Sequence, residues 1–387
     1  MVPSDWERKP IKELCESIID CVNKTAKHVE HITPFKMIRT TNVRNGRVDT
    51  ENVRFVEEDV YKQWIRRGAP KDGDIIFTRE APVGEVGILE NAKGIFLGQR
   101  TMMYRAAPEI SDNRFLFYSL MSGYCQKQIE DLSNGGTVAH MRVPDCGELM
   151  INTPPIKEQK KIAKILSTWD KAISTTERLI DSSKLQKKAL MQQLLTGKKR
   201  LLDDSGKPFK GEWTKVELGK LLDYKQPTPY LVKSTDYSNE YSIPVLTAGK
   251  TFILGYSNEN FGIFEEELPA IIFDDFTTAS KFVDFPFKAK SSAMKILVAK
   301  QGVSIKFVYE AMQVLNYPVG GHQRHWISIF ANLVIGLPSP PEQQKIASVL
   351  SNADKEIELL EQQLADLKQE KKALMQQMLT GKRRVKI

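Results

Sequence analysis

Polar turns in both halves of the sequence carry the residue types that read base edges in nucleic acids. Arginine can fork onto guanine O6 and N7, and asparagine or glutamine can bond adenine N6 and N7. In the first half, the candidates for DNA contact are Arg39, Thr41, Asn42, Arg44, Arg79, Arg100, His140 and Arg142. In the second half, they are Lys250, Lys281, His322, Gln323 and Arg324. The bland alternative is that these are solvated surface groups, because charged side chains are mostly exposed in any protein.

Two of these turns follow a glycine pair. Gly135-Gly136 precedes His140 and Arg142, and Gly320-Gly321 precedes the His322–Arg324 run. Because both halves place basic or amide residues just after the pair, these segments are the strongest candidates. Neither half contains a segment with the pattern of a DNA-recognition helix, so we expect loops to make the contacts.

A catalytic alternative rests on two adjacent acids. Asp274 and Asp275, with Lys281, suggest a divergent metal-dependent, sequence-specific endonuclease. The first half has Thr78-Arg79 in the equivalent place, so a shared nuclease centre is not supported. The sequence also lacks an ATP-binding glycine loop, a methyltransferase Asn/Asp-Pro-Pro-aromatic turn and paired-cysteine metal ligands, so we expect no catalytic residues and no metal site.

The elements that must position these turns are revealed by an internal repeat. The segment from Glu158 to Arg200 aligns without a gap on the segment from Glu342 to Arg384, and more than half of the positions are identical. Prolines precede both segments, and Gly197 and Gly381 follow them as expected for left-handed helix caps. The chain is therefore two copies of one unit, a globular segment followed by a long helix.

Apolar residues recur in both repeated segments at alternating intervals of four and three, the pattern of a coiled-coil seam. The predicted seam comprises Ile162, Leu166, Trp169, Ile173, Ile180, Leu190 and Leu194, and then Ile346, Leu350, Ile357, Leu360, Leu364, Leu367, Leu374 and Met378. Lys187 and Lys371 also fall on the seam. Each either fixes the register of the helices or lies exposed at a frayed end, and both interpretations stay open.

The two globular segments predict an α+β fold. Short strand-like runs such as 75–77 and 271–273 alternate with glycine and proline turns. The predicted division is 1–153 and 201–337 as globular domains, with 154–200 and 338–387 as long helical segments. Neither helical seam can stay exposed, so we expect the two helices to pair antiparallel, with a pseudo-twofold internal duplication.

The bulk properties fit a soluble protein with a polyanionic partner. The net charge is +8 at pH 7, with Lys-Arg-Arg close to the C-terminus. Excess positive charge favours nucleic acid but does not prove it. All four cysteines lie in the first half, where free thiols in a reducing compartment are expected. No signal sequence or apolar stretch of membrane length occurs, so we expect a cytoplasmic protein that does not contact membranes.

Several motifs in this sequence resemble one known family. They are PP..EQ.KIA..L and KKALMQQ.LTGK in both helical repeats, GDIIFTREAPVGEVGIL at 73–89, GQRTMMYRA at 98–106 and IPVLTAGK at 243–250. The chain resembles the specificity subunit of type I restriction–modification systems over nearly its whole length. The helical motifs are specific as a repeated pair, whereas the globular matches are individually weak.

The resemblance implies a subunit with no catalytic activity and no cofactor of its own. The globular segments 1–153 and 201–337 would be target recognition domains, each reading one half of a bipartite site in double-stranded DNA. The segments 154–200 and 338–387 would be helical spacers that set the gap. The partners implied are two methyltransferase subunits, which use S-adenosylmethionine, and ATP- and magnesium-dependent restriction subunits. A coiled-coil adaptor for proteins only is a weaker alternative, because the helix ends and loops are basic.

Overall fold

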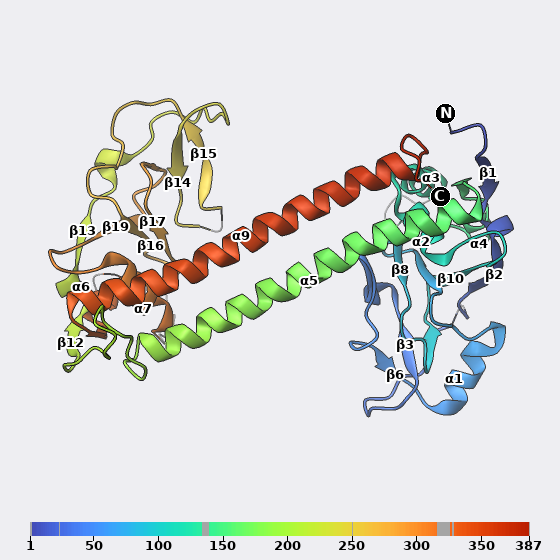
Figure 1. Cartoon of the computed structure of the whole chain (residues 1–387), viewed down its shortest axis with the longest axis horizontal. Helices are drawn as coiled ribbons and strands as arrows, with labels where there is room; N and C mark the ends of the chain where they lie inside the picture. Colours follow the sequence, from blue (N-terminus) through green and yellow to red (C-terminus); the bar gives the residue numbers. More distant parts are fainter. Residues whose placement is uncertain are drawn as a thin grey trace. The chain divides into compact units, whose positions relative to one another are not determined.

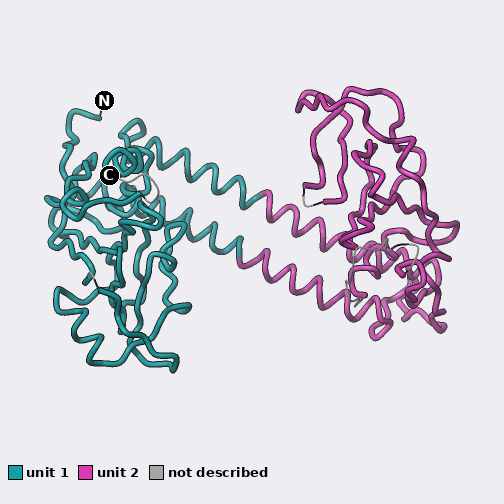
Figure 2. Tube along the Cα trace, turned by 180° about the vertical axis from the view of Figure 1, so that it is seen from behind, with its two compact units in different colours: residues 1–177, 363–387 teal, residues 178–362 magenta. Residues whose placement is uncertain are grey.

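The computed structural model describes residues 2–22, 24–133, 139–249, 251–315, 326 and 329–386 (Figure 1). The chain divides into two compact units (Figure 2). Unit 1 comprises Met1–Glu177 and Gln363–Ile387, and unit 2 comprises Arg178–Gln362. We call the globular part of each unit, outside the two long helices, its head.

The head of unit 1 is built on three sheets. The largest has the order β2-β10-β7-β8-β5-β4, and the others are β6-β3-β9 and β1-β11. The strands are β1 (Glu7–Pro10), β2 (Cys15–Asp20), β3 (Lys36–Ile38), β4 (Val43–Arg44), β5 (Gly46–Val48), β6 (Arg54–Phe55), β7 (Ile75–Arg79), β8 (Val83–Ile88), β9 (Ile95–Leu97), β10 (Thr101–Ala106) and β11 (Met150–Thr153). The helices are α1 (Glu58–Trp64), α2 (Asn113–Met121), α3 (Gly123–Leu132) and α4 (Val143–Cys146).

The head of unit 2 repeats this plan with fewer strands. Its sheets have the orders β13-β19-β16-β17, β15-β14-β18 and β12-β20. The strands are β12 (Thr214–Glu217), β13 (Leu222–Lys225), β14 (Ile243–Leu246), β15 (Ile253–Ser257), β16 (Ala270–Asp274), β17 (Ser280–Val283), β18 (Lys288–Ala289), β19 (Met294–Ala299) and β20 (Val334–Leu337). The helices are α6 (Leu218–Leu221) and α7 (Ile305–Val314).

The two heads share one topology. The run β2-β10-β7-β8 in unit 1 corresponds to β13-β19-β16-β17 in unit 2, and the parallel pair β3–β9 corresponds to the parallel pair β14–β18. Unit 1 also pairs β5 with β8 in parallel. The central strands β7 and β16 are almost fully buried, which explains the apolar run Ile-Ile-Phe that both contain. The predicted α+β fold with an internal duplication is confirmed.

Two long helices, α5 (Ile156–Leu194) and α9 (Pro340–Met378), each contribute one part to either unit. In unit 1, Lys368 near the end of α9 binds Glu177 of α5 at 3.0 Å. In unit 2, Lys184 of α5 binds Glu361 of α9 at 2.7 Å. The helices therefore pair antiparallel within each unit, as predicted. No helix among the described residues is long and apolar enough to cross a bilayer.

The seam of this pairing follows the predicted spacing. Its buried residues are Ile162, Leu166, Ile173, Ile180, Leu194, Ile346, Leu350 and Met378, and its half-buried residues are Trp169, Leu190, Ile357, Leu360, Leu364, Leu367 and Leu374. Gly197 and Gly381 have φ angles of 70° and 73°, the left-handed caps expected from the sequence. The compact units cut across the predicted spacer segments, because antiparallel pairing joins the start of one helix to the end of the other.

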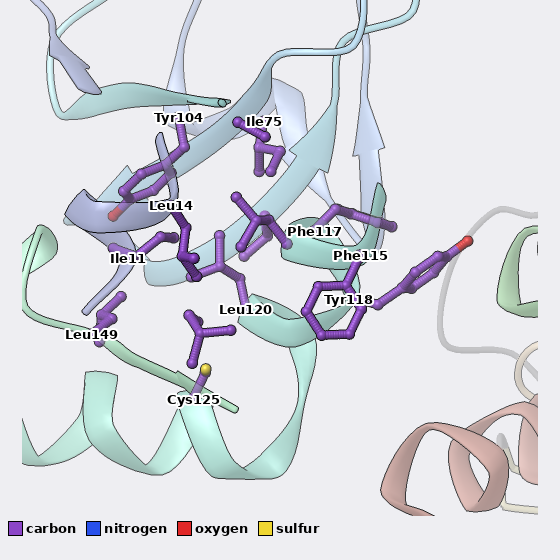
Figure 3. Close-up of a cluster of buried hydrophobic side chains, with 14 of the residues drawn as sticks. Ile11, Leu14, Ile75, Tyr104, Phe115, Phe117, Tyr118, Leu120, Cys125 and Leu149 are labelled. Carbon is purple, nitrogen blue, oxygen red and sulfur yellow. The ribbon is translucent and has the colours of Figure 1, made fainter. Parts of the chain in front are cut away.

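Each head packs an apolar core onto the ends of these helices. In unit 1, side chains from the sheet and from α2 form one buried cluster, which also contains Ile162 and Leu166 of α5 (Figure 3). Tyr118 belongs to this cluster, but its hydroxyl lies at the edge, away from Ile11 and Leu14. In unit 2, Phe307 and Val308 of α7 pack in a cluster with Ile346 and Leu350 of α9.

The four cysteines are free thiols, and burial raises the pKa of each. Desolvation raises the pKa of Cys15, Cys125 and Cys146 to about 12. Since only the thiolate is nucleophilic, we expect these thiols to react with iodoacetamide at pH 8 roughly a thousandfold more slowly than in the urea-unfolded chain. Mass spectrometry of the labelled protein measures the rates. Labelling of Cys125 at the unfolded rate would contradict the prediction.

The same pKa shifts make the fold sensitive to alkali. The folded pKa is raised above the unfolded value of 9.0, so the folded state holds protons that the unfolded state releases. The stability contribution is therefore complete below about pH 9 and falls as the pH rises toward 12.

Candidate nucleic-acid interface

The parallel strand pair β3–β9 of unit 1 brings two candidate turns to one edge. Strands β3 and β9 run parallel, with Ile38 opposite Leu97, so their carboxyl ends lie together. Arg39 follows β3 directly, and the 98–100 turn follows β9. The backbone N–H of Gly98 donates to the carbonyl of Ile38 at 2.7 Å, which joins the two turns. Polar side chains at such an edge form a shared surface.

The residues after β3 differ in accessibility. Thr41 and Arg44 are exposed, and Arg39 is half-buried. Asn42 is buried: its amide nitrogen donates to the carbonyl of Asn52 at 2.8 Å, and its amide oxygen accepts from the backbone of Arg39 at 3.0 Å. Asn42 therefore has a structural role, holding the short 3₁₀ helix η2 (Thr40–Asn42), whereas Thr41 and Arg44 are free to face a ligand.

Arg79, at the end of β7, binds two other segments of the head. Its side chain is 15% exposed, and its Nε donates to Asp20 Oδ1 at 3.1 Å. A second guanidinium nitrogen donates to the carbonyl of Met141 at 3.2 Å, and the Met141 N–H donates to the carbonyl of Arg79 at 2.9 Å. The segment that follows the first glycine pair is thus fixed to the end of β7.

Three further candidates lie around Arg79. Arg100 has a φ angle of 68° and pairs with Glu80 at 3.2 Å, with half of its side chain exposed. His140 is exposed and forms a backbone bridge with Glu80. Arg142 is exposed and binds Asp145 at 2.7 Å. The structure thus gathers Arg79, Arg100, His140 and Arg142, which are far apart in sequence, around the end of β7.

In unit 2, most of the candidates cannot be placed. Lys250, His322, Gln323 and Arg324 lie outside the described residues, as do both glycine pairs. Lys281 is exposed on β17, opposite Ile272 of β16. The N–H of Trp326, just beyond the second basic run, donates to Asp275 Oδ1 at 2.9 Å. Asp275 is equivalent to Arg79. In both heads, therefore, the residue at this end of the central strand binds a residue that follows the glycine pair in sequence, Met141 in unit 1 and Trp326 in unit 2.

One cation missed by sequence reasoning is Lys290. It follows β18, the strand equivalent to β9, and its backbone N–H donates to the carbonyl of Leu246 at 2.9 Å. Its ammonium donates to the Tyr237 hydroxyl at 3.0 Å. The internal duplication could have indicated this residue, because Lys290 is at the position equivalent to the turn that carries Arg100. The sequences of the two heads differ too much for this equivalence to be recognised without the structure.

The two acids of the endonuclease alternative, Asp274 and Asp275, both accept hydrogen bonds from other groups of the same head. Asp274 accepts hydrogen bonds from the Phe276 N–H at 2.9 Å and the Thr277 hydroxyl at 2.6 Å. Asp275 is buried and pairs with Lys295 at 3.5 Å as well as binding Trp326. Within the described ranges, no three His, Cys, Asp or Glu side chains are grouped as metal ligands would be. The nuclease alternative is not supported.

The heads therefore present exposed cations and hydroxyls on turns and on neighbouring short strands. Lysine and arginine in such positions can contact phosphates, and arginine, threonine and histidine can bond base edges. The exposed members of this set that the structure describes are Thr41, Arg44, Arg100, His140, Arg142, Lys281 and Lys290.

Comparison with known proteins gives a consistent result. The type I restriction modification DNA specificity domain matches residues 3–182 and 210–369. The EcoR124I/EcoR124II specificity subunit of Escherichia coli is 49% identical over 145 residues, which cover 36% of this chain and 35% of that protein. The chain thus aligns with about a third of that relative. The putative MjaX specificity subunit of Methanocaldococcus jannaschii is 26% identical over 429 residues, covering 100% of this chain and 95% of that protein.

Solved structures share the fold at low sequence identity. A type I restriction–modification S subunit from M. genitalium has a TM-score of 0.64 at 18% identity, with 97% of this chain and 96% of that chain covered. A second structure, from work on complex assembly of a type I system, has a TM-score of 0.53 at 14% identity, with 98% and 99% covered. Because the family match extends over both halves of the sequence, the chain belongs to the family of type I restriction–modification specificity subunits.

Proposed function

We propose that this chain reads a bipartite site in double-stranded DNA, one half-site with each head, while the long helices set the unspecified gap. The observation that carries the proposal is the contrast between the two halves. The heads share a topology but present different side chains on equivalent turns, whereas the helical repeats are identical at more than half of their positions. Equivalent frames with different contact residues suit two different half-sites.

The proposal includes the partners and the division of labour. The chain recruits two methyltransferase subunits that use S-adenosylmethionine and restriction subunits that use ATP and magnesium, and it holds no cofactor and performs no catalysis itself. The chain acts in the cytoplasm.

A methylation map tests this function directly. The chain is co-expressed with its neighbouring methyltransferase subunit in a host that lacks DNA methylation, and the genome is sequenced for N6-methyladenine. We expect a two-part motif with a fixed gap that disappears when this chain is omitted. Soluble, assembled protein that adds no methylation would overturn the proposal.

Arg44 offers a test of individual contacts, because it is exposed on β4 and comes from a predicted DNA-contact turn. If Arg44 contacts a phosphate, Arg44→Ala should weaken binding equally for all sequences and reduce the slope of log affinity against log salt by about 1. If it contacts a base, one position of the first half-site should lose specificity by about 1–3 kcal/mol.

Fluorescence anisotropy with the assembled complex and duplex DNA, over a salt series, separates the two outcomes. Lys62→Ala is the matched control, since Lys62 lies on α1 and pairs with Glu58 one turn earlier. Wild-type affinity and slope in Arg44→Ala would remove Arg44 from the interface.

A further inference from the structure

Both seam lysines lie in clusters that join a head to the two long helices. In unit 1, Lys371 of α9 binds Asp170 of α5. The Tyr118 hydroxyl of α2 donates to the same carboxylate at 2.5 Å, and its oxygen accepts from the Ser167 hydroxyl at 3.2 Å. The Lys371 ammonium also lies 5.2 Å from the centre of the Tyr118 ring. We call Lys371, Asp170 and Tyr118 the unit 1 cluster.

Unit 2 builds the same junction with different chemistry. Lys187 of α5 binds Asp354 of α9 at 2.5 Å and Glu310 of α7 at 3.2 Å. Lys306 of α7 binds Glu310 at 2.8 Å and Asp354 at 3.0 Å. These four residues are the unit 2 cluster. It contains two cations and two carboxylates, so its charges balance.

The two clusters are equivalent by position. Asp170 and Asp354, like Lys187 and Lys371, match through the helical repeat. Tyr118 lies six residues after Asp112, the N-cap of α2, and Glu310 lies six residues after Ser304, the N-cap of α7. The helix residues are therefore the same in both units, whereas each head supplies its own partner.

The clusters are partly shielded from water. The Glu310 side chain is fully buried, and Lys187 and Lys371 are 17% and 12% exposed, whereas Asp354 and Asp170 are each 40% exposed. Ion pairs shielded from water are screened far less by salt than surface pairs are. Burial alone would raise the pKa of Asp354, but hydrogen bonds from Lys187 and then Lys306 hold that pKa below its usual value. Burial, followed by the bond to Asp170, raises the pKa of Tyr118.

The clusters add direction to an otherwise apolar attachment. Leu166 in unit 1 and Leu350 in unit 2 pack in the core shared with the head, and the cluster aspartate lies four residues, about one turn, further along the same helix. Apolar packing is non-directional, whereas a hydrogen bond weakens steeply when its angle changes. A polar contact one turn beyond the apolar one resists tilting of the head on the helices.

We propose that Tyr118 and Glu310 are positioning residues that hold each head at a fixed angle on the helix pair and thereby sharpen the choice of gap between half-sites. This inference rests on the function proposed above. A head that can tilt would accept half-sites one base pair nearer or further, while its own contacts to bases would be unchanged.

The test measures methylation against gap length. Plasmids carry the two half-sites of the wild-type map with gaps from two base pairs shorter to two longer, and the complex of this chain with its methyltransferase partner is assayed on each. With Tyr118→Phe or Glu310→Gln, we expect methylation at gaps one base pair off, relative to the correct gap, to rise about fivefold, the effect of losing one typical hydrogen bond. The half-site sequences should stay the same.

Lys184→Ala is the matched control, because the Lys184–Glu361 pair links the same two helices on an exposed face. It should leave the gap profile unchanged. A merely structural role for Tyr118 would lower methylation at every gap in proportion and leave the ratio constant. Asp170→Asn weakens the unit 1 cluster from the helix side and should broaden the profile as Tyr118→Phe does.

Two results would overturn the inference. One is a wild-type gap profile in folded Tyr118→Phe and Glu310→Gln complexes, and the other is disagreement between Tyr118→Phe and Asp170→Asn. If the wild-type complex itself shows no bipartite motif, the proposed function fails independently of these variants. Thermal unfolding of each complex identifies variants that lose the fold.

Discussion

Replacing Leu350 by alanine is expected to lower the free energy of unfolding by about 3 kcal/mol. Leu350 is on the seam of α9, fully buried in the core cluster of unit 2. The substitution removes apolar contacts both with α5 and with the head, and it leaves a cavity that the packed neighbours cannot fill. Urea unfolding followed by circular dichroism measures the change.

Leu359→Ala on the same helix is the matched control. Leu359 is 61% exposed, and both substitutions replace leucine by the best helix-forming residue. Its effect should stay within about 0.5 kcal/mol. Equal losses from the two variants would show that the seam assignment on α9 is wrong, because burial is the feature that distinguishes the two leucines.

Replacing Glu342 by alanine is expected to lower the free energy of unfolding by about 3 kcal/mol. Here the loss arises from a buried charge pair and not from apolar packing. Glu342 is fully buried in the first turn of α9, where helix dipoles favour an acid. The Arg200 guanidinium donates to both of its oxygens, at 2.5 and 2.7 Å, and the Trp213 indole N–H donates at 3.3 Å. Without the carboxylate, Arg200 and the indole lose their acceptor.

Gln344→Ala, two residues further along α9, is the control, since Gln344 is exposed. The same urea titration should give a change within about 0.5 kcal/mol for Gln344→Ala. A loss below about 1 kcal/mol for Glu342→Ala would mean that the arginine contributes little beyond what water offers the carboxylate.

Unit 1 contains the equivalent arginine–glutamate pair, and a second acid, Asp5, also binds the arginine. Arg384 binds Glu158 at 2.7 Å, the Trp6 indole donates to Glu158 at 3.3 Å, and Arg384 also binds Asp5 at 2.7 Å. The basic residue after each helix thus closes onto the first turn of the other helix. The sequence predicted basic residues at helix C-termini but could not indicate this partner, because Arg384 and Glu158 are 226 residues apart.

The candidate interface shows the same division. Sequence reasoning placed Thr41, Arg44, Arg100, His140 and Arg142 on turns, and the structure describes each of them as exposed. Asn42 and Arg79 were predicted on the same grounds, but their side chains stabilise the fold by hydrogen bonds to Asn52 and Asp20. Residue type and turn position cannot distinguish the two groups, since the burial of a polar side chain depends on distant segments that satisfy its hydrogen bonds.

The sequence by itself determined the duplication, the two long helices, their caps and their antiparallel seam. The helices, their caps and the seam spacing depend on local periodicity and on the conformational limits of glycine and proline. The duplication follows from the alignment of two distant segments, and the antiparallel pairing follows from the twofold that the duplication implies. Only the tertiary structure decided the role of the seam lysines, which the sequence left open between register and fraying. Their partners, Tyr118 and Glu310, come from heads whose packing sets which side chain meets the helix. Such contacts follow from the three-dimensional arrangement of segments far apart in sequence, so no local pattern specifies them.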